Sequence, residues 1–534
     1  MTARQIEGDY RTVVDVLRAA ARVNAEVEAY VEPAVGATPR RALTFGQWER
    51  AADGVAGLLA DRGVTRGSVV ALMLPSSLDY MVGFAAATRL GAITSGINPR
   101  LGGHEVRSIL ERTRPVVTVV DDGAEPPDGP AGTVMYRAEV ARGVDGPAPS
   151  RWPDLEPTDP VAVVWTSGTT GLPKGAVFDH RRLAAVAAGT DVLSEPGDRR
   201  LSPLPFAHVG SMTRTWDEAV HGVTTVITPT PWKAADCLAV MTKERITVGQ
   251  GVPTQWALLL AEPGLDTADL SSLRMVGTGA SRVPAELVAA LREQFGVPVV
   301  VRYTSTEASL GTGTVPGDPD QVVATTVGRP VPGVSLAIAD EVGAEVVAGD
   351  VGRVRIRSGA VMLGYWGGPP TGPGIDGVAF DEAATRSVLD DDGWLTTGDF
   401  GFIDAGGNLH LVGRANEMYI RGGYNVYPTE VESVLSAHPA VAQAAVMGTP
   451  DPVLGEIGVA FVVPVPGSEV SLAGLRSWAA GSLADYKSPD RLVVVGSLPV
   501  TSMMKVDKQS LAGPAAEAAA ADHHRQTTTT ARNS

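Results

Sequence analysis

Thr-Ser-Gly-Thr-Thr-Gly-Leu-Pro-Lys-Gly, residues 166–175, directly follows the apolar run 161–165. The apolar run predicts a buried β-strand, and the polar stretch predicts the loop that leaves it. Glycines let backbone N–H groups approach an anion, hydroxyls donate further hydrogen bonds, and the lysine adds a positive charge. The spacing differs from a Walker A loop, where Lys follows the second glycine directly. The segment therefore predicts a polyphosphate-binding loop of another kind at the end of a strand.

Length and composition restrict the class of protein. At 534 residues the chain exceeds one ordinary core, so two or more domains are expected. A net charge of −16 argues against a general nucleic-acid binder, and no apolar run reaches the roughly 18 to 20 residues that cross a bilayer. Cys237 is the single cysteine, which excludes an internal disulfide and fits a reducing compartment. Since the start of the chain lacks a secretory leader pattern, a cytoplasmic protein is predicted.

Strands and helices alternate along most of the chain, which predicts an α/β fold with helix-covered sheets. Residues 68–74 and 116–120 read as buried strands, and residues 79–90 between them read as a helix. Around residues 334–357 strands follow one another directly, which indicates a small antiparallel or barrel-like unit.

A second, smaller unit is predicted to begin after residue 414. The pattern over the next 100 residues or so suits a small α+β domain, with helices at 429–437 and 472–483 and strands at 441–447, 458–463 and 491–495. Residues 513–534 are rich in Ala and Thr, and we expect them to form a disordered tail.

Further polar segments follow predicted strands or turns. In the segment 303–307 a tyrosine can stack on a base and Glu307 can hold Mg²⁺ against triphosphate oxygens, although a strand-end turn with a solvated acid explains it equally. The small residues 277–281 allow close approach of a flat ligand. Asp399, on a Gly-flanked turn, can accept hydrogen bonds from ribose hydroxyls, and Arg414 can supply complementary donors.

Two other residues have simple explanations when they are considered alone. His208 ends a strand-like run, where a histidine is more often part of a core than catalytic. Lys505 stands near Lys508 in a late loop, where lysines are usually surface charges.

Taken together, in order and spacing, these segments resemble the acyl-adenylate-forming superfamily, which includes acyl-CoA synthetases, firefly luciferase and peptide-synthetase adenylation domains. The resemblance covers about residues 10–512 and is nearest to bacterial fatty-acyl- or aryl-CoA ligases. It implies that a carboxylate attacks the α-phosphorus of ATP, giving acyl-AMP and pyrophosphate, and that a thiol, usually of CoA, then expels AMP. It also implies a large N-terminal adenylation domain, residues 1–415, and a mobile C-terminal domain, residues 416–512, with Asn416 at the hinge.

The resemblance assigns a role to each matched residue. Lys505 matches the catalytic lysine that bridges the substrate carboxylate and the α-phosphate, Glu307 matches the Mg²⁺-binding acid, and His208 matches a residue that orients the acid. The nucleotide-binding matches are the phosphate loop (Thr166, Ser167, Gly168, Thr169, Thr170, Lys174), the adenine-binding residues (Gly279, Ala280, Tyr303), the neighbouring Thr306 and the ribose pair (Asp399, Arg414). Gly422 and Gly423 match the glycines that line the pantetheine tunnel of CoA.

Three positions depart from the family pattern. Thr304 and Met504 replace glycines, and Asn416 replaces the Asp or Lys of many members. A threonine at 304 is expected to narrow the adenine or acyl pocket, and a methionine at 504 is expected to restrict the backbone before Lys505.

The predicted acyl pocket has small, mildly polar residues at Val209, Gly210, Thr213, Gly277 and Ser309. They suit a medium-chain, aryl or ring-bearing acid. Arg214 is better explained as a helix-surface arginine, with pairing to a second substrate charge as the alternative.

The resulting hypothesis is an ATP-dependent carboxylic acid–CoA ligase that uses ATP, Mg²⁺ and CoA. The alternatives are delivery to a carrier protein or an amine, and activation of nitrite to diazotise an aryl amine. A non-catalytic nucleotide sensor is disfavoured because every charged residue of the matched site is present. The expected partners are the acid, ATP and CoA, without nucleic acid or a membrane span, and a homodimer is left open.

Overall fold

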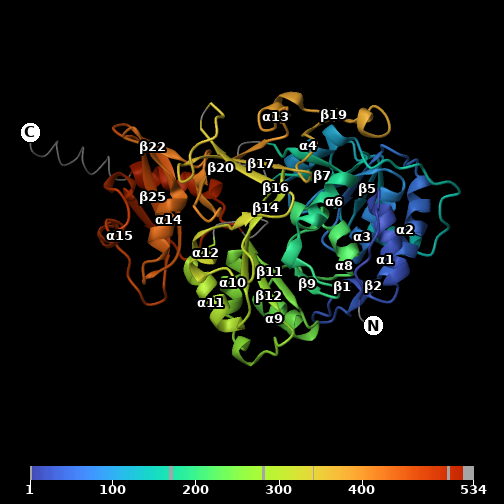
Figure 1. The fold of residues 1–534 in the computed structure, drawn as a ribbon, viewed down its shortest axis with the longest axis horizontal. Coiled ribbons are helices and arrows are strands. Elements are labelled where there is room, and N and C mark those ends of the chain that lie inside the picture. The colour runs from blue at the N-terminus through green and yellow to red at the C-terminus, as the bar shows by residue number, and fades with distance from the viewer. Residues whose placement is uncertain (1–2, 167–171, 280–282, 341, 502–504, 521–534) are drawn as a thin grey trace, which may run out of the picture.

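The computed structural model describes residues 3–166, 172–279, 283–340, 342–501 and 505–520. Within these residues the strands form five sheets, and helices cover the two largest (Figure 1). The α/β class predicted from the strand–helix alternation is confirmed.

The first large sheet contains the strand that precedes the phosphate loop. Its six strands run in the order β6 (Thr133–Tyr136), β5 (Val117–Val120), β3 (Val69–Met73), β4 (Ile93–Gly96), β7 (Pro160–Trp165) and β8 (Gly175–Asp179). All neighbours are parallel except β7 and β8, which are antiparallel. All six residues of β7 are buried, as its apolar run predicts, so the loop after β7 starts from a fixed strand.

The second large sheet has nine strands and carries most of the pocket described below. Their order is β15 (Arg329–Pro330), β14 (Ser309–Gly313), β13 (Val299–Ser305), β12 (Met275–Gly279), β11 (Val248–Gly251), β9 (Arg199–Ser202), β10 (Thr224–Ile227), β1 (Glu28–Glu32) and β2 (Arg41–Thr44). The six central strands, β13 through β1, are mutually parallel, and the outer pairs are antiparallel. Parallel strands align their carboxyl ends at one edge, where ligands bind in such sheets.

Helices cover the faces of both large sheets. They are α1 (Val13–Val23), α2 (Phe45–Ala60), α3 (Leu78–Arg89), α4 (Gly103–Thr113), α5 (Arg137–Gly143), α6 (His180–Ala188), α7 (Val209–Met212), α8 (Thr215–His221), α9 (Ala234–Lys243), α10 (Pro253–Leu260), α11 (Ala285–Phe295) and α12 (Asp320–Thr325). Every residue of α3 is buried, because α2 and α5 pack on it from outside. Its first turn is capped by the Ser77 side chain, which accepts a hydrogen bond from the backbone N–H of Tyr80.

A small antiparallel sheet follows, in the region where the sequence predicts direct strand succession. Its strands are β16 (Val334–Ala339), β17 (Gly352–Ser358), β20 (Leu395–Ile403) and β21 (Leu409–Arg414). Between β17 and β20 lie a two-stranded sheet and one short helix, namely β18 (Trp366–Gly368), β19 (Ala379–Phe380) and α13 (Glu382–Arg386).

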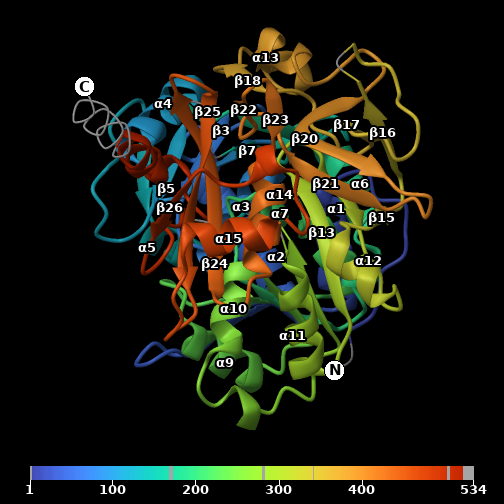
Figure 2. The same ribbon diagram turned by 90° about the vertical axis from the view of Figure 1, so that its left-hand side faces the viewer.

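The C-terminal elements form their own sheet at one end of the molecule (Figures 1 and 2). Its strands are β22 (Tyr419–Arg421), β23 (Tyr424–Val426), β24 (Val441–Asp451), β25 (Gly455–Pro464) and β26 (Arg491–Val494), and its helices are α14 (Pro428–Ser436) and α15 (Leu472–Ala479). Single 3₁₀ turns lie at Asp191–Leu193, Leu265–Thr267, Ile375–Gly377, Asp485–Lys487 and Gln509–Leu511. The helices and strands agree with the predicted pattern, while the domain division at residue 416 stays a prediction.

The expected disordered tail is wrong for its first part. Residues 512–520 are helical, and Ala515 and Ala519 are buried. Ala515 packs with Leu511 against Val459 and Phe461 of β25, so a run of small residues supplies the helix face that fits the sheet. Residues 521–534 lie outside the described part of the chain.

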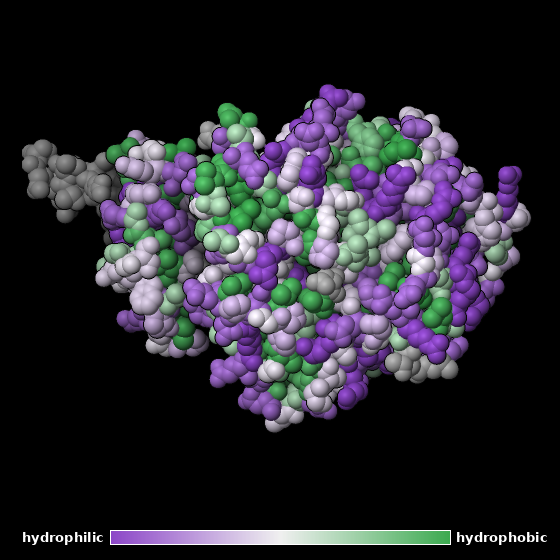
Figure 3. All heavy atoms as spheres, in the orientation of Figure 1, coloured by the Kyte–Doolittle hydropathy of each residue, from purple (hydrophilic) through white to green (hydrophobic). Residues whose placement is uncertain are grey.

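The surface mixes hydrophilic and hydrophobic residues over the face shown in Figure 3. No described helix combines the length and apolar character that crossing a membrane requires.

Candidate active site

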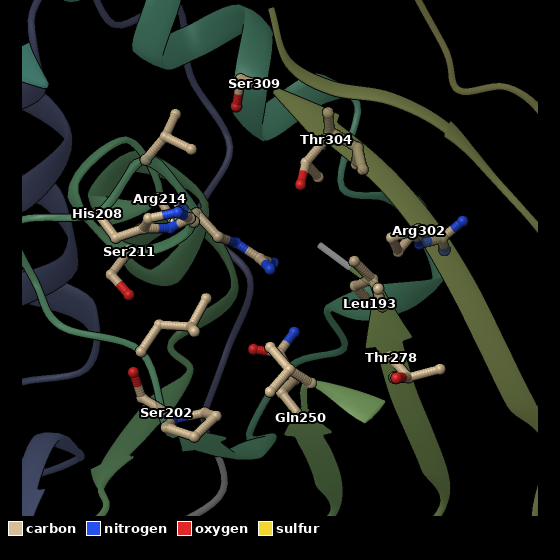
Figure 4. Close-up of a pocket in the computed structure, with 18 of the residues that line it drawn as sticks. Leu193, Ser202, His208, Ser211, Arg214, Gln250, Thr278, Arg302, Thr304 and Ser309 are labelled. Carbon is tan, nitrogen blue, oxygen red and sulfur yellow. Dashed lines mark hydrogen bonds between the residues drawn. The ribbon is translucent and has the colours of Figure 1, made fainter. Parts of the chain in front are cut away.

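A pocket opens at the carboxyl edge of the nine-stranded sheet, where β9, β11, β12 and β13 end (Figure 4). It has a volume of about 120 Å³. Its walls come from strand ends, from α7 and from the turns beside them; they are Val186, Thr190, Leu193, Ser202, Pro203, Leu204, His208, Val209, Gly210, Ser211, Arg214, Gln250, Gly251, Val252, Gly277, Thr278, Gly279, Arg302, Thr304, Ser309 and Leu310. The predicted acyl residues Val209, Gly210, Gly277 and Ser309 are among them, whereas Thr213 is fully buried beside the pocket.

The predicted ribose pair forms across two neighbouring strands. Asp399 of β20 lies opposite Arg414 of β21 in the register, and Arg414 Nε donates to Asp399 Oδ1 at 3.1 Å. Tyr303 Oη donates to the other oxygen, Oδ2, at 2.5 Å. Burial, and then the charge of Asp399, raises the pKa of Tyr303 well above its usual value, so its hydroxyl stays protonated. Each carboxylate oxygen keeps a second lone pair, which leaves acceptors for ribose hydroxyls.

Gly279, the predicted adenine-binding glycine, ends β12 next to Tyr303 on β13. It has φ +157, and a Cβ there would lie 2.2 Å from the carbonyl oxygen of Arg302. Only glycine therefore permits this close approach of two strand ends. Tyr303 has its hydroxyl committed to Asp399, and its stacking on adenine stays a prediction. Ala280 lies outside the described residues.

The two ends of the phosphate loop are tied together. Thr166 N–H donates to the carbonyl of Lys174 at 2.8 Å, and Lys174 N–H donates to Thr166 Oγ1 at 3.1 Å. These bonds continue the β7–β8 pairing and fix where the loop begins and ends. The predicted phosphate contacts of Ser167, Gly168, Thr169 and Thr170 lie outside the described residues.

Tyr365 links the two predicted phosphate-side residues and was missed by the sequence analysis. Its hydroxyl donates to Glu307 Oε1 at 2.6 Å, and Lys174 Nζ lies 5.1 Å from the centre of its ring. Glu307 and Thr306 stand in the turn between β13 and β14. Tyr365 and Trp366 form an aromatic pair at the start of the Gly- and Pro-rich stretch 364–377, and this pair was the signal available in the sequence. Tyr365 is 4% exposed, so this end of the stretch is packed.

Lys505 reaches the same site from the C-terminal unit. Its carbonyl accepts from Thr501 N–H at 2.7 Å, and Val500 pairs with Val506, so Lys505 is tied to the backbone at Thr501. Burial, and then the charge of Arg414, lowers the pKa of Lys505 to about 8, although Asp399 opposes the shift. Lys505 thus lies within electrostatic range of both the ribose pair and His208. Met504 lies outside the described residues.

His208 lines the pocket as the N-cap of α7, and its Nδ1 accepts from Gly210 N–H at 3.2 Å. Burial, and then the charge of Lys505, lowers its pKa to about 3, so the ring is neutral near pH 7. Because Nδ1 accepts, the hydrogen-bond pattern assigns the ring proton to Nε2. Neutral His208 is therefore equipped to donate one hydrogen bond from Nε2 to a carboxylate.

The expectation that Arg214 lies on a helix surface is wrong. It is 9% exposed and donates from Nη2 to Asp217 Oδ2 at 2.8 Å. Arg200, on β9, donates to the same oxygen at 3.1 Å. The signal for burial was the pair Asp217-Glu218, because acids three and four residues along a helix offer a partner to a buried arginine.

Gly422 and Gly423 are exposed and are not part of this pocket. They form the two-residue turn between β22 and β23, with φ +57 and +87. Positive φ at both central residues is the requirement of a type I′ hairpin, so the turn alone accounts for both glycines. Asn416 lies in the turn 415–417 that follows β21.

The described residues contain no group of three or more His, Cys, Asp or Glu side chains arranged to hold a metal ion. Glu307 contributes one carboxylate. Mg²⁺ in nucleotide sites is commonly held by one or two carboxylates together with substrate phosphates and water, so a single acid beside the phosphate loop fits that pattern.

Comparison with known proteins places this site in a family. The model of the AMP-binding enzyme family matches residues 17–366, and that of the AMP-binding enzyme C-terminal domain matches residues 430–505. The chain belongs to the AMP-binding enzyme family.

Individual relatives match over nearly their whole length. The chain is 34% identical to an indoleacetate–CoA ligase of Aromatoleum aromaticum over 89% of this chain and 93% of the relative. It is 31% identical to the long-chain-fatty-acid–CoA ligase FadD13 of Mycobacterium tuberculosis over 93% and 97%. The crystal structure of the anthranilate CoA ligase AuaEII in complex with anthranoyl-AMP superposes with a TM-score of 0.84 at 28% identity, covering 96% of this chain and 99% of that one.

Proposed function

We propose that the protein is an ATP-dependent carboxylic acid–CoA ligase that works through an acyl-AMP intermediate. The observation that carries the proposal is that Lys505 interacts electrostatically both with the Asp399–Arg414 pair and with His208, which lines the pocket. The full-length similarity to acid–CoA ligases supports the same reaction.

In the first step an oxygen of the substrate carboxylate bonds to the α-phosphorus of ATP, and the bond from that phosphorus to the bridging oxygen of pyrophosphate breaks. His208 Nε2–H orients the carboxylate. The main barrier to this reaction is the repulsion between the two anions that must meet, the substrate carboxylate and the α-phosphate. Protonated Lys505 neutralises their charge. Asp399 and Arg414 hold the ribose, and Thr166 and Lys174 hold the phosphate chain.

A magnesium ion would be held by Glu307 together with phosphate oxygens. When bound, it neutralises the charge on the triphosphate and its leaving group. The Tyr365 hydroxyl donates to one oxygen of Glu307 and so fixes the direction in which the carboxylate faces.

In the second step the sulfur of CoA bonds to the acyl carbon, the bond to the AMP oxygen breaks, and the thiol proton passes to solvent. The Gly422–Gly423 turn is exposed and away from the pocket in this arrangement. Its use as the pantetheine-binding loop therefore requires the unit after Asn416 to rotate, exchanging Lys505 for that turn.

The acid is of moderate size. An apolar cavity of about 150 Å³ holds benzene, so a pocket of about 120 Å³ suits a group near the size of one ring. The relatives named for indoleacetate and in complex with anthranoyl-AMP support a ring-bearing acid. A cytoplasmic location would supply the ATP and CoA that the reaction needs. The single cysteine, Cys237, is free and buried, which is consistent with that location. A homodimer stays a prediction.

A mass-spectrometric product assay tests the proposal, using ATP, Mg²⁺ and a panel of fatty, aryl and ring-bearing acids with and without CoA. The expected products are AMP, pyrophosphate and an acyl-CoA that forms only with CoA. Acyl-AMP that persists in the presence of CoA would show that CoA is not the acceptor. The absence of any activated acid would contradict the proposed function.

A further inference from the structure

Arg214 presents a charged group to the inside of the acid pocket. Figure 4 shows its guanidinium projecting into the space between Thr304 and Gln250. The side chain is 9% exposed, and its surroundings are more deeply buried still, since Arg200 is 2% exposed and Asp217 is 0% exposed. His208, by contrast, interacts with the charge of Lys505. Arg214 therefore belongs to the inner end of the pocket, and His208 belongs to the reacting end.

Only part of the guanidinium is used by the protein. Nη2 donates to Asp217 Oδ2 at 2.8 Å and to Ser194 Oγ at 3.4 Å. Nε is buried and has no hydrogen-bond partner within the described part of the chain. A buried charged donor without a partner loses its hydration without a compensating hydrogen bond, so an acceptor atom supplied by a ligand would stabilise it.

The cluster behind Arg214 contains a second arginine, Arg200, and two acids, Asp217 and Glu218. Arg200 Nη1 lies 3.6 Å from Glu218 Oε1, and His221 Nδ1 lies 3.2 Å from Asp217 Oδ1. Two arginines share Asp217 Oδ2, because Arg200 Nη2 also donates to it at 3.1 Å. Burial opposes ionisation of Asp217, but the charges of Arg214 and Arg200 hold its pKa well below the usual value. The second acid, Glu218, accepts from Tyr30 at 2.6 Å and from Thr225 at 2.8 Å, and burial raises its pKa.

A second polar group of the same pocket is also without a partner. Thr278 Oγ1, on β12, is buried and makes no hydrogen bond to any described residue. Arg214 and Thr278 lie on different walls, so the inner pocket offers donors from two sides to one occupant.

We propose that Arg214 determines substrate specificity by donating a hydrogen bond to an acceptor oxygen, a keto or carboxylate oxygen, on the acyl group remote from the reacting carboxylate. The preferred acids are therefore oxo acids or dicarboxylic acids of moderate size, and plain hydrocarbon acids are poor substrates. This proposal rests on the proposed function, since it concerns the acid that the enzyme activates.

The test compares matched acids that differ only at the remote end. One series is hexanoate, 5-oxohexanoate and adipate, and the other is 3-phenylpropanoate with a 4-acetyl or a 4-carboxy group on the ring. The readout is kcat/KM for acid-dependent AMP formation. We expect the wild-type enzyme to favour an oxygen-bearing acid over its hydrocarbon partner by at least about tenfold in one series, because a buried donor left unpaired discriminates strongly. Within each series, comparison of the keto acid with the dicarboxylic acid shows whether the preferred hydrogen-bond acceptor is a keto oxygen or a carboxylate oxygen.

Three variants assign the preference to Arg214. Arg214→Met should bring the ratio to within about threefold of one, and Arg214→Lys, which keeps the charge beside Asp217 but lacks Nε, should reduce it less. Arg386→Met is the matched control, because it makes the same change at an exposed arginine paired with Glu382, and it should keep the wild-type ratio. Thermal unfolding confirms that each variant is folded. If Arg214→Met is not folded, the ratio for Arg214→Lys decides.

Two outcomes overturn the inference: a wild-type ratio near one in both series, or a preference that survives both substitutions of Arg214. If no acid of either series or of the wider panel is activated, the proposed function fails instead, so the two failures are distinguishable.

Discussion

The nucleotide side and the acid side of the pocket are built by different means. On the nucleotide side, Asp399 pairs with Arg414 across adjacent strands, and Glu307 accepts a hydrogen bond from Tyr365. On the acid side, small residues come from several separate strand ends, and Arg214 is supported by a buried cluster behind the wall. We therefore expect the nucleotide side to carry the reaction and the acid side to determine the choice of substrate. Variants of the two sides are expected to change different kinetic parameters.

Removal of Lys505 should have the largest effect. Lys505→Ala is expected to lower acyl-AMP formation by about 10³-fold or more, equivalent to about 4 kcal/mol of transition-state stabilisation, because no other cation bridges the two reacting anions. Conversion of supplied acyl-AMP to acyl-CoA should be largely retained. Pyrophosphate release and thioester formation are measured separately, with the exposed Lys243→Ala as control. Survival of both half-reactions would show that Lys505 is not the adenylation lysine.

Asp399→Asn comes next, and it should affect ATP alone. It weakens the acceptors for ribose and for the Tyr303 and Arg414 donors, so the KM for ATP should rise about 10- to 100-fold, as expected for a charge-assisted pair, while the KM for the acid changes little. Steady-state kinetics with each substrate varied in turn gives both values. Asp392→Asn, at an exposed aspartate, is the matched control. An equal rise in both KM values would contradict the separation of the two sides.

The pH profile distinguishes Lys505 from His208. Lys505 acts when charged, and its pKa is lowered to about 8, so kcat/KM for the acid should fall as pH rises through about 8. Lys505→Arg should move this limb to higher pH, because guanidinium stays charged. His208 has a pKa lowered to about 3, so no limb should appear near its ordinary value of about 6.5. A limb near 6.5 that disappears in His208→Gln would show that the imidazole titrates during catalysis.

Thr304→Gly should have the smallest effect, and that effect should be limited to the kinetic parameters for the acid. Removing the side chain enlarges the pocket, so kcat/KM should shift toward bulkier acids by about tenfold, the scale of one or two methylene-sized groups. The KM for ATP should be unchanged. Ser211→Gly, at another pocket-lining position, serves as a matched enlargement. A rise in the KM for ATP would mean that Thr304 belongs to the nucleotide side.

Sequence alone predicted the nucleotide side better than the acid side, for a physical reason. Residues such as Lys174 and Asp399 stand in short segments whose spacing along the chain is itself the signal. The local pair Asp217-Glu218 indicates that Arg214 has a partner, but the burial of Arg214 also depends on where α8 packs and on Arg200 of β9. Tyr365 was missed for the same reason, because it reaches Glu307 from a segment that reads as a loop. The helix at 512–520 was missed because alanines that fit a sheet look like low-complexity tail.

The most direct test of the account follows oxygen from the acid. An accepted acid labelled with ¹⁸O in both carboxylate oxygens is incubated with ATP, Mg²⁺ and CoA, and the products are analysed by mass spectrometry. If the carboxylate attacks the α-phosphorus, one labelled oxygen must appear in AMP and the other must remain in the acyl-CoA. Unlabelled AMP, or label in inorganic phosphate together with ADP, would contradict an acyl-AMP intermediate.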